Sequence, residues 1–143
     1  MHTRPITIQA HPWSHAQLWA VPIRYNVFVL EQQVPVTIEM DELDAVSTHY
    51  VAFHGHQAIG TARITPDFHI GRVAVQQGWR SSGIGRMLMD AIVKDLGDRD
   101  LHLNAQTAVE QFYKKLGFKA HGDTFMEAGI EHISMMRSGH QAA

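Results

Sequence analysis

The sequence has no cysteine among its 143 residues. Disulfide bonds, thiolate metal sites and a covalent cysteine intermediate are therefore excluded. No apolar run approaches the ~20 residues that span a bilayer, and the first residues carry no apolar stretch like that of a secretion signal. We therefore expect a cytoplasmic protein with no membrane partner.

Neither sign of charge predominates. The net charge is −2 with histidine neutral, so the chain lacks the basic excess that binds nucleic acid or an anionic membrane. The eleven histidines are scattered without an HExxH motif, and two of them flank Gly55 in an expected hairpin turn. We therefore expect no metal site and no nucleic-acid partner.

The hydrophobic content of 45% is enough for one ordinary globular core, and the length suits a single domain spanning residues 1–143. Alternation and β-branched runs predict strands at Ile6–Ile8, His49–Phe53, Gln57–Ile64, Phe68–Val75, Leu101–Leu103, Phe118–His121 and Ile130–Met136. A β-rich first half followed by alternating β and α elements predicts an α/β domain.

Helical spacing predicts three helices, at Ser14–Glu31, Gly85–Leu96 and Thr107–Leu116. Pro22 should kink the first helix or divide it in two. Gly97 is expected to cap the second helix at its C-terminus. The segment Gln32–Asp44 contains a proline and four acidic residues and is expected to form a loop.

The most informative segment runs from Val73 to Arg86, where a β-branched run leads into Arg-Ser-Ser-Gly-Ile-Gly and a helical pattern follows. This order places free backbone N–H groups and a helix N-terminus around one small concavity. Such a concavity binds phosphate, so the segment predicts a phosphate-bearing ligand. A plain glycine-rich turn would look similar, because glycine adopts positive φ without steric cost.

Two nucleotide-binding motifs fit this segment poorly. A Walker loop needs GxxxxGK[ST]; Gly78 and Gly83 have its spacing, but Ile84 and Gly85 stand at the lysine and hydroxyl positions. A dinucleotide-binding turn needs GxGxxG, and Leu88 occupies its third glycine position. The phosphate ligand is therefore expected to belong to another class.

The remaining pattern, Arg-x-x-Gly-x-Gly over residues 80–85, resembles the pyrophosphate loop of the GNAT superfamily of acetyl-CoA-dependent N-acetyltransferases. Other segments are similar to GNAT patterns in the same order, and the first and last of them resemble the ElaA-like branch of small bacterial members. These segments are Arg24–Pro35, the acidic loop with the hairpin after it, Leu103–Phe118, and Gly129–Met135. The resemblance implies a GNAT acyl-CoA N-acyltransferase fold, a mixed central β-sheet flanked by helices, with acetyl-CoA as co-substrate.

The resemblance also implies how acetyl-CoA is held: the strand before the loop binds the thioester arm by its main chain, and the loop binds the pyrophosphate. The residues so implied are Val73, Ala74, Val75, Arg80, Ser81, Ser82, Gly83, Ile84, Gly85, Arg86 and Asn104. Other interpretations stay open, namely a strand paired on both sides, a solvated Arg86, and a helix-start role for Asn104.

Tyr113 is the best candidate for a general acid. A phenol of pKa ~10 can protonate a departing thiolate of pKa ~8.5 if it lies at the sulfur. Its spacing from Val109 and Leu116 also suits a core position. The resemblance of the segment Gln-Phe-Tyr-Lys-Lys-Leu-Gly-Phe to the family favours the catalytic role.

An amine acceptor must be neutral to react, and with a pKa of ~10.4 only about 0.1% of an alkyl amine is neutral near pH 7.4. A base or an ordered water beside a carboxylate could remove the proton. The candidate substrate-side residues are Glu31, Glu39, Asp41, Asp44 and His132. The acids of the loop, which include Glu42, also predict a cationic acceptor through electrostatic attraction.

We therefore predict an N-acetyltransferase in which a primary amine, of a small cationic molecule, attacks the thioester directly. The alternative is a non-catalytic GNAT-fold module that senses acyl-CoA or binds a partner. The identity of the amine, the range of acyl groups and the oligomeric state stay open, and a homodimer is in keeping with the family.

Overall fold

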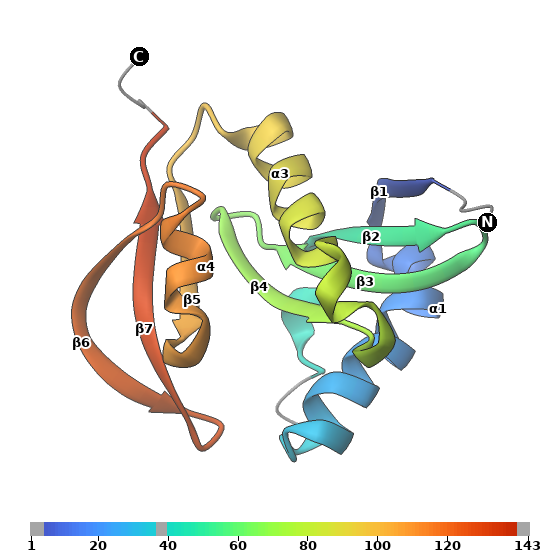
Figure 1. The fold of residues 1–143 in the computed structure, drawn as a ribbon, viewed down its shortest axis with the longest axis horizontal. Helices are drawn as coiled ribbons and strands as arrows, with labels where there is room; N and C mark the ends of the chain where they lie inside the picture. The colour runs from blue at the N-terminus through green and yellow to red at the C-terminus, as the bar shows by residue number, and fades with distance from the viewer. Residues whose placement is uncertain (1–4, 37–39, 140–143) are drawn as a thin grey trace.

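A mixed seven-stranded sheet forms the centre of the protein, with strand order β1-β2-β3-β4-β5-β7-β6 (Figure 1). The computed structural model describes residues 5–36 and 40–139. The strands are β1 (Ile6–Pro12), β2 (Thr48–His54), β3 (Gln57–Ile64), β4 (His69–Val75), β5 (Leu101–Gln106), β6 (Lys119–Glu127) and β7 (Ile130–Arg137). Neighbouring strands are antiparallel except β4 and β5, which are parallel. The mixed α/β architecture expected from the sequence is confirmed.

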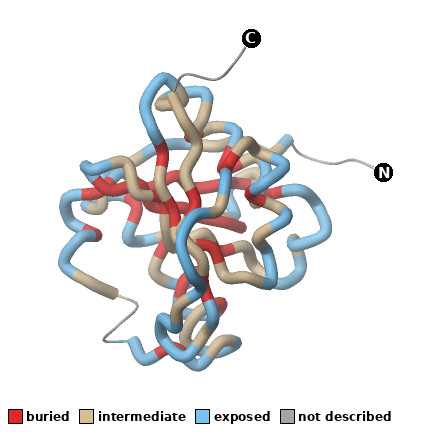
Figure 2. Tube along the Cα trace, turned by 90° about the vertical axis from the view of Figure 1, so that its left-hand side faces the viewer, coloured by how far each residue is buried: buried red, intermediate tan, exposed pale blue. Residues whose placement is uncertain are grey.

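Helices cover both faces of the sheet, α1 (Trp13–Arg24) on one and α3 (Ile84–Leu96) on the other (Figure 1). Residues of β2 alternate between these faces, because successive side chains of a strand point to opposite sides. Tyr50 and Ala52 belong to the core under α3, whereas Val51 and Phe53 pack toward α1. The strands β2 and β3 are accordingly buried along most of their length, and buried segments lie toward the centre of the molecule (Figure 2).

The shorter helical segments are η1 (Tyr25–Glu31), η2 (Glu42–Val46), η3 (Gln77–Ser82), η4 (Thr107–Val109) and α4 (Glu110–Lys114). Within the described residues, no helix is long and apolar enough to cross a membrane. The segments η1, η3 and α4 matter most here, because they surround the opening between β4 and β5 described below.

The sequence predicted that Pro22 kinks the first helix or divides it in two, and the helix continues through Pro22. Pro22 stays inside α1, and the helix changes to π-type hydrogen bonding at Tyr25, which begins η1. A proline lacks one backbone N–H and crowds the carbonyl four residues earlier, here that of Leu18, so the disturbance falls before Pro22 and not in η1. The result is one continuous helical segment that ends at Glu31.

One other local expectation needs correction, and another is confirmed. The expected loop Gln32–Asp44 runs into the short 3-10 helix η2, whose start is capped by a hydrogen bond from the Leu43 N–H to the Asp41 side chain. Gly97 is the C-cap residue of α3, as expected; its φ is −69° and its N–H donates to the carbonyl oxygen of Val93. Glycine suits this position for lack of space, since a Cβ would lie 2.4 Å from the carbonyl oxygen of Val93.

The strands β4 and β5 are paired over only part of their length. Their register contains two pairs, His69 with His102 and Ile70 with Leu103. On its other side β4 continues to pair with β3, but the register shifts near Arg72, which has φ of +52°. An extra residue in one strand bends it away from its neighbour. β4 and β5 therefore diverge beyond Ile70 and Leu103 (Figure 1).

Candidate active site

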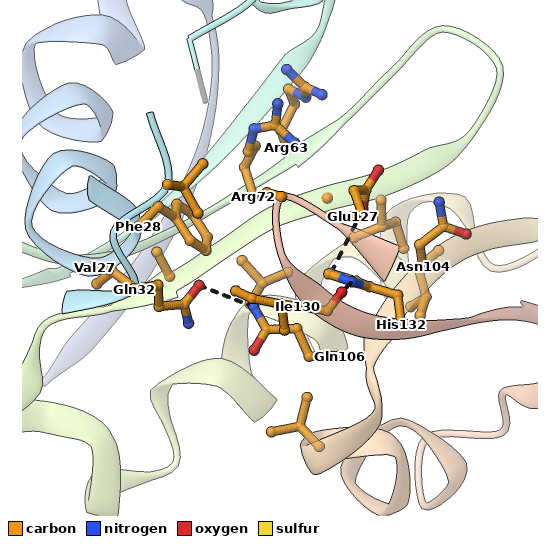
Figure 3. Close-up of a pocket in the computed structure, with 18 of the residues that line it drawn as sticks. Val27, Phe28, Gln32, Arg63, Arg72, Asn104, Gln106, Glu127, Ile130 and His132 are labelled. Atoms are coloured by element: carbon orange, nitrogen blue, oxygen red, sulfur yellow. Dashed lines mark hydrogen bonds and ion pairs between the residues drawn. The ribbon is translucent and has the colours of Figure 1, made fainter. Parts of the chain in front are cut away.

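A cleft of about 720 Å³ occupies the space where β4 and β5 diverge. Its walls come from β4 and β5, from η1 and the segment after it, from α4, and from the turn between β6 and β7. Figure 3 shows Val27 and Phe28 on one side of the cleft and Asn104 and His132 on the other. Segments distant in the sequence thus meet around one opening in the sheet.

One wall of the cleft is the free edge of β4. Val73, Ala74 and Val75 line the cleft, and their strand is paired with β3 but not with β5 at this level. The alternative of a strand paired on both sides is therefore excluded. Apart from the carbonyl oxygen of Val75, which accepts from Arg80, main-chain groups on this edge are available to an extended ligand, which could lie against β4 as a strand would.

The glycine segment lies at the end of this edge. The 3-10 helix η3 was not expected from the sequence, and it leads to Gly83, which has φ of +76° and directly precedes α3. No side chain caps the start of α3, so its first N–H groups are open to an anion. Ser81 and Ser82 are exposed, whereas the side chain of Ile84 is buried in the core.

The two arginines of this segment have different surroundings. Arg80 donates from Nε to the carbonyl oxygen of Val75 at 3.1 Å and pairs through Nη2 with Glu31 at 2.7 Å. Arg86 lies on the exposed side of α3 and faces Asp90 at 3.6 Å. Arg80 is therefore fixed at the cleft, and Arg86 is a solvated residue near the start of the helix.

Tyr113, on α4, is buried and lines the cleft. Its ring packs edge-on against Phe112 and Phe118, with ring centroids 5.0 and 6.2 Å away. Burial raises the pKa of Tyr113 to about 12, so the hydroxyl keeps its proton at physiological pH. The core position that the spacing of Tyr113 suggested is confirmed, and the residue also borders the cleft, while its role as a general acid stays a prediction.

Asn104 lies inside β5, immediately after the last residue that pairs with β4. It does not start a helix, so that interpretation is wrong; Gln106 precedes η4 instead. The hydroxyl of Ser134 donates to Asn104 Oδ1 at 2.9 Å. That bond orients the amide and leaves its N–H₂ group as a donor beside the cleft.

The acidic loop is neutralised by arginines. Asp44 is buried and accepts hydrogen bonds from Arg24 at 2.8 and 3.1 Å and from Arg63 at 3.1 Å. Asp41 accepts from Arg63 at 2.7 Å and from Arg72 at 3.0 Å. Burial opposes ionisation of Asp44, but the two guanidinium groups outweigh it and lower the pKa of this carboxyl. Three cations therefore surround two carboxylates.

This network corrects the expectation that the acidic loop attracts a cationic acceptor. Asp44 does not line the cleft, and Asp41 lines it but is shared by two guanidinium groups. Glu42 is exposed on η2, and Glu39 lies outside the described residues. Glu31 lines the cleft, but beside the glycine segment and paired with Arg80.

His132 lines the cleft from β7 and meets a residue that the sequence analysis missed. Its Nε2 lies 3.6 Å from Glu127 Oε2, at the end of β6 (Figure 3). The hairpin between them turns at Ala128 and Gly129, with φ of +52° and +77°. The sequence gives one indication of this hairpin: Phe125 and Glu127 lie two apart, just before a two-residue turn. That indication directly precedes the Gly129–Met135 segment.

Two glutamines form a bridge across the cleft, and neither was expected from the sequence. Gln106 Nε2, at the end of β5, donates to Gln32 Oε1 at 3.1 Å, just after η1 (Figure 3). They are 74 positions apart in the chain, so no local pattern could have paired them. In the chain described here, no group of three or more metal-ligating side chains is placed to hold a metal ion.

A sheet opened at one parallel pair, with a helix N-terminus at one end of the opening, defines an acyl-CoA N-acyltransferase fold. Residues 22–138 match the model of the acetyltransferase (GNAT) domain, and the chain belongs to that family. A crystal structure of an acyl-CoA N-acyltransferase from Pseudomonas aeruginosa superimposes with a TM-score of 0.80 at 27% identity, covering 94% of this chain and 100% of that one.

Within the family the chain belongs to the ElaA-like branch. It is 31% identical to Protein ElaA of Escherichia coli over 141 residues, which covers 90% of this chain and 92% of ElaA. The ElaA crystal structure has a TM-score of 0.80 and covers 94% of this chain and 100% of its own. The chain is also 38% identical over 122 residues to "Uncharacterized N-acetyltransferase YjcF" of Bacillus subtilis, covering 80% and 87% of the two chains.

Proposed function

We propose that this protein transfers an acetyl group from acetyl-CoA to the primary amine of a small molecule. The observation that carries the proposal is the divergence of β4 and β5, which leaves a free main-chain edge in a cleft that also contains Tyr113. We assign the activity to the domain formed by residues 1–143 and place it in the cytoplasm. The acceptor amine is protonated in solution near pH 7, so it enters the cleft as a cation.

The residues of the cleft suit acetyl-CoA. The pyrophosphate would bind the N–H groups of residues 80–85 and the start of α3, with positive charge from Arg80 and Arg86. Ser81, Ser82 and Ile84 would contribute mainly through their main chain, since two of these side chains point to solvent and the third into the core. The thioester arm would lie along Val73–Val75, and the amide N–H₂ of Asn104 would donate to it.

The chemistry requires one proton to leave the amine before attack and another to reach the sulfur after it. The neutral amine attacks the thioester carbonyl carbon, a C–N bond forms, and the C–S bond breaks. Tyr113 gives its proton to the departing sulfur. The phenolate then takes a proton from the newly acetylated nitrogen, which is a much stronger acid than a phenol. The products are the N-substituted acetamide, the CoA thiol and one proton, which the base holds.

A thiol-release assay with acetyl-CoA and a panel of amines tests the proposal, because a protein without cysteine adds no thiol of its own. Tyr113→Phe removes only the hydroxyl, and we expect kcat to fall by roughly 10²–10⁴-fold with little change in acetyl-CoA affinity. Tyr25→Phe is the matched control, since Tyr25 is exposed on η1 and does not line the cleft. Binding of acetyl-CoA without turnover of any amine would instead identify a sensor.

A further inference from the structure

The β6–β7 hairpin brings a pair of ionisable side chains into the cleft, and neither residue belongs to the acetyl-CoA contacts proposed above. In its register, Phe125 lies opposite His132 and Glu127 lies opposite Ile130. Residues two apart on a strand, and residues directly opposite each other, share one face of the sheet. Glu127, Ile130 and His132 all line the cleft, so this face is the cleft wall (Figure 3).

The hydrogen bonding of His132 fixes which ring nitrogen is basic. Nδ1 lies 2.7 Å from the carbonyl oxygen of Ile130, and a carbonyl can only accept, so Nδ1 carries the proton. In the neutral ring, Nε2 is then a bare acceptor. The ring stacks on Phe125 with an angle of 22° between the planes, and its side chain is only 11% exposed. His132 is therefore held in one orientation.

Glu127 supplies the negative charge beside this nitrogen. Its Oε2 lies 3.6 Å from His132 Nε2, which is too long for a direct hydrogen bond. One ammonium nitrogen can donate hydrogen bonds to two acceptors at this separation, with a distance of about 2.9 Å from the nitrogen to each acceptor. The Glu127 side chain is 54% exposed, so a ligand in the cleft can reach it.

The other acids of the cleft are already engaged. Glu31 pairs with Arg80, and Asp41 is shared by Arg63 and Arg72. The ion-pair partner of Glu127 is a histidine rather than a permanent cation. Glu127 is therefore the cleft carboxylate best placed to receive a cation.

The charged groups around the pair do not cancel this attraction. From β4, His69 lies within electrostatic reach of Glu127; burial lowers the pKa of His69, so it is predominantly neutral at pH 7. From β5, the residue opposite His132 is Gln106, which carries no charge. Arg63 acts on His69 from β3, but its guanidinium group is engaged by two aspartates.

We propose that the ammonium group of the acceptor binds between Glu127 and His132, and that His132 Nε2 removes its proton before it attacks the thioester. This inference rests on the proposed acetyl transfer and names the base for it. One N–H bond of the ammonium breaks and one Nε2–H bond forms, giving imidazolium beside the Glu127 carboxylate and a neutral amine. The imidazolium later releases its proton to water.

The experiment compares His132→Gln with the wild type across pH, because a base that neutralises an amine becomes dispensable once the amine is neutral. Between pH 7.5 and 9.5 the neutral fraction of an amine of pKa ~10.4 rises nearly 100-fold. At pH 7.5 we expect His132→Gln to lose roughly 100-fold in kcat/KM, within the usual range for a general base. Its kcat/KM should then rise by about 100-fold by pH 9.5, and much more steeply than that of the wild type.

Glu127→Gln should raise KM for the amine more than it lowers kcat, without changing the affinity for acetyl-CoA. The matched controls are His121→Gln and Glu131→Gln, which alter exposed residues of the same hairpin and should change neither constant. A loss in His132→Gln that stays constant from pH 7.5 to 9.5, or a loss no larger than in His121→Gln, would overturn the assignment. Enzyme-free aminolysis is subtracted at each pH.

Nitrogen-15 NMR of the histidine ring gives a readout that needs no turnover. We expect Nδ1 of His132 to carry the proton, and Nε2 to shift when n-butylammonium chloride is added but not when n-butanol is added. The opposite tautomer, or no response to the ammonium, contradicts the inference. If the ring responds but no amine on the panel is acetylated, the ammonium site stands and the proposed acetyl transfer fails.

Discussion

Replacing Asp44 by asparagine should strongly destabilise the fold, because this carboxylate neutralises a cation that has no access to water. Arg24 is 0% exposed and donates two hydrogen bonds to Asp44, while Arg63 donates a third. Asparagine keeps one acceptor oxygen, but its N–H₂ group would face guanidinium donors. Breaking a buried ion pair by removing one partner costs about 3–5 kcal/mol. That is a large fraction of the roughly 5–15 kcal/mol that stabilises a typical domain.

Urea unfolding at pH 7, followed by circular dichroism, measures the effect as a lower transition midpoint with an unchanged slope. Glu42→Gln is the control, since Glu42 is exposed on the same segment, and its change should stay within about 0.5 kcal/mol. An Asp44→Asn protein within 1 kcal/mol of the wild type would refute the network as a source of stability.

Acid titration supplies an independent check on Asp44. Its pKa in the folded protein lies below the unfolded value of 3.8, so the folded state binds fewer protons and stability rises with pH. The contribution is fully present above pH 3.8 and is lost as the pH falls through the lower, folded value. We therefore expect Asp44→Asn to flatten the stability profile below about pH 4.

Three further predictions address packing, the glycine loop and a buried histidine. Gly60→Ala should cost about 1–3 kcal/mol in urea unfolding, since its Cβ would lie 2.9 Å from Ile84 Cγ2 and would push α3 off β3. Gly83→Ala should weaken acetyl-CoA binding in calorimetry more than Gly83→Asn, because φ of +76° disfavours alanine more than asparagine. Burial lowers the pKa of His49 in the folded protein, so its contribution to stability is present above pH 6.5 and is lost below it. His49→Gln should therefore reduce the fall in unfolding free energy between pH 7 and 5.

Elements with a strong local pattern were predictable from the sequence. The helix α3 has buried residues at helical spacing, and the β2–β3 hairpin consists of two largely apolar runs on either side of Gly55, so both were placed to within a residue or two. The family and its fold also followed, because the glycine segment and Leu103–Phe118 lie close together in a recognisable order. Such features depend on residues that are close together in the chain, so a single sequence is enough to predict them.

The surroundings of the site residues were not predictable in the same way. Asp44 was expected on the substrate side, among the loop acids that attract a cation, but Arg24 and Arg63, each about twenty positions away, neutralise it. Glu127 was missed because the strand expected at Phe118–His121 extends much further, to the Ala128–Gly129 turn. Which charges cancel, and which remain available to a ligand, depends on tertiary contacts that spacing does not encode.

Two register pairs, His69 with His102 and Ile70 with Leu103, are all that joins the four strands β1–β4 to the three strands β5, β7 and β6. A ligand that lies along Val73–Val75 would add the hydrogen bonds that β5 does not supply, and would act as a missing strand between the halves. Its affinity would then contribute to the cohesion of the sheet. Amide hydrogen exchange should accordingly slow on both sides of the opening at once, including at residues that the ligand never touches.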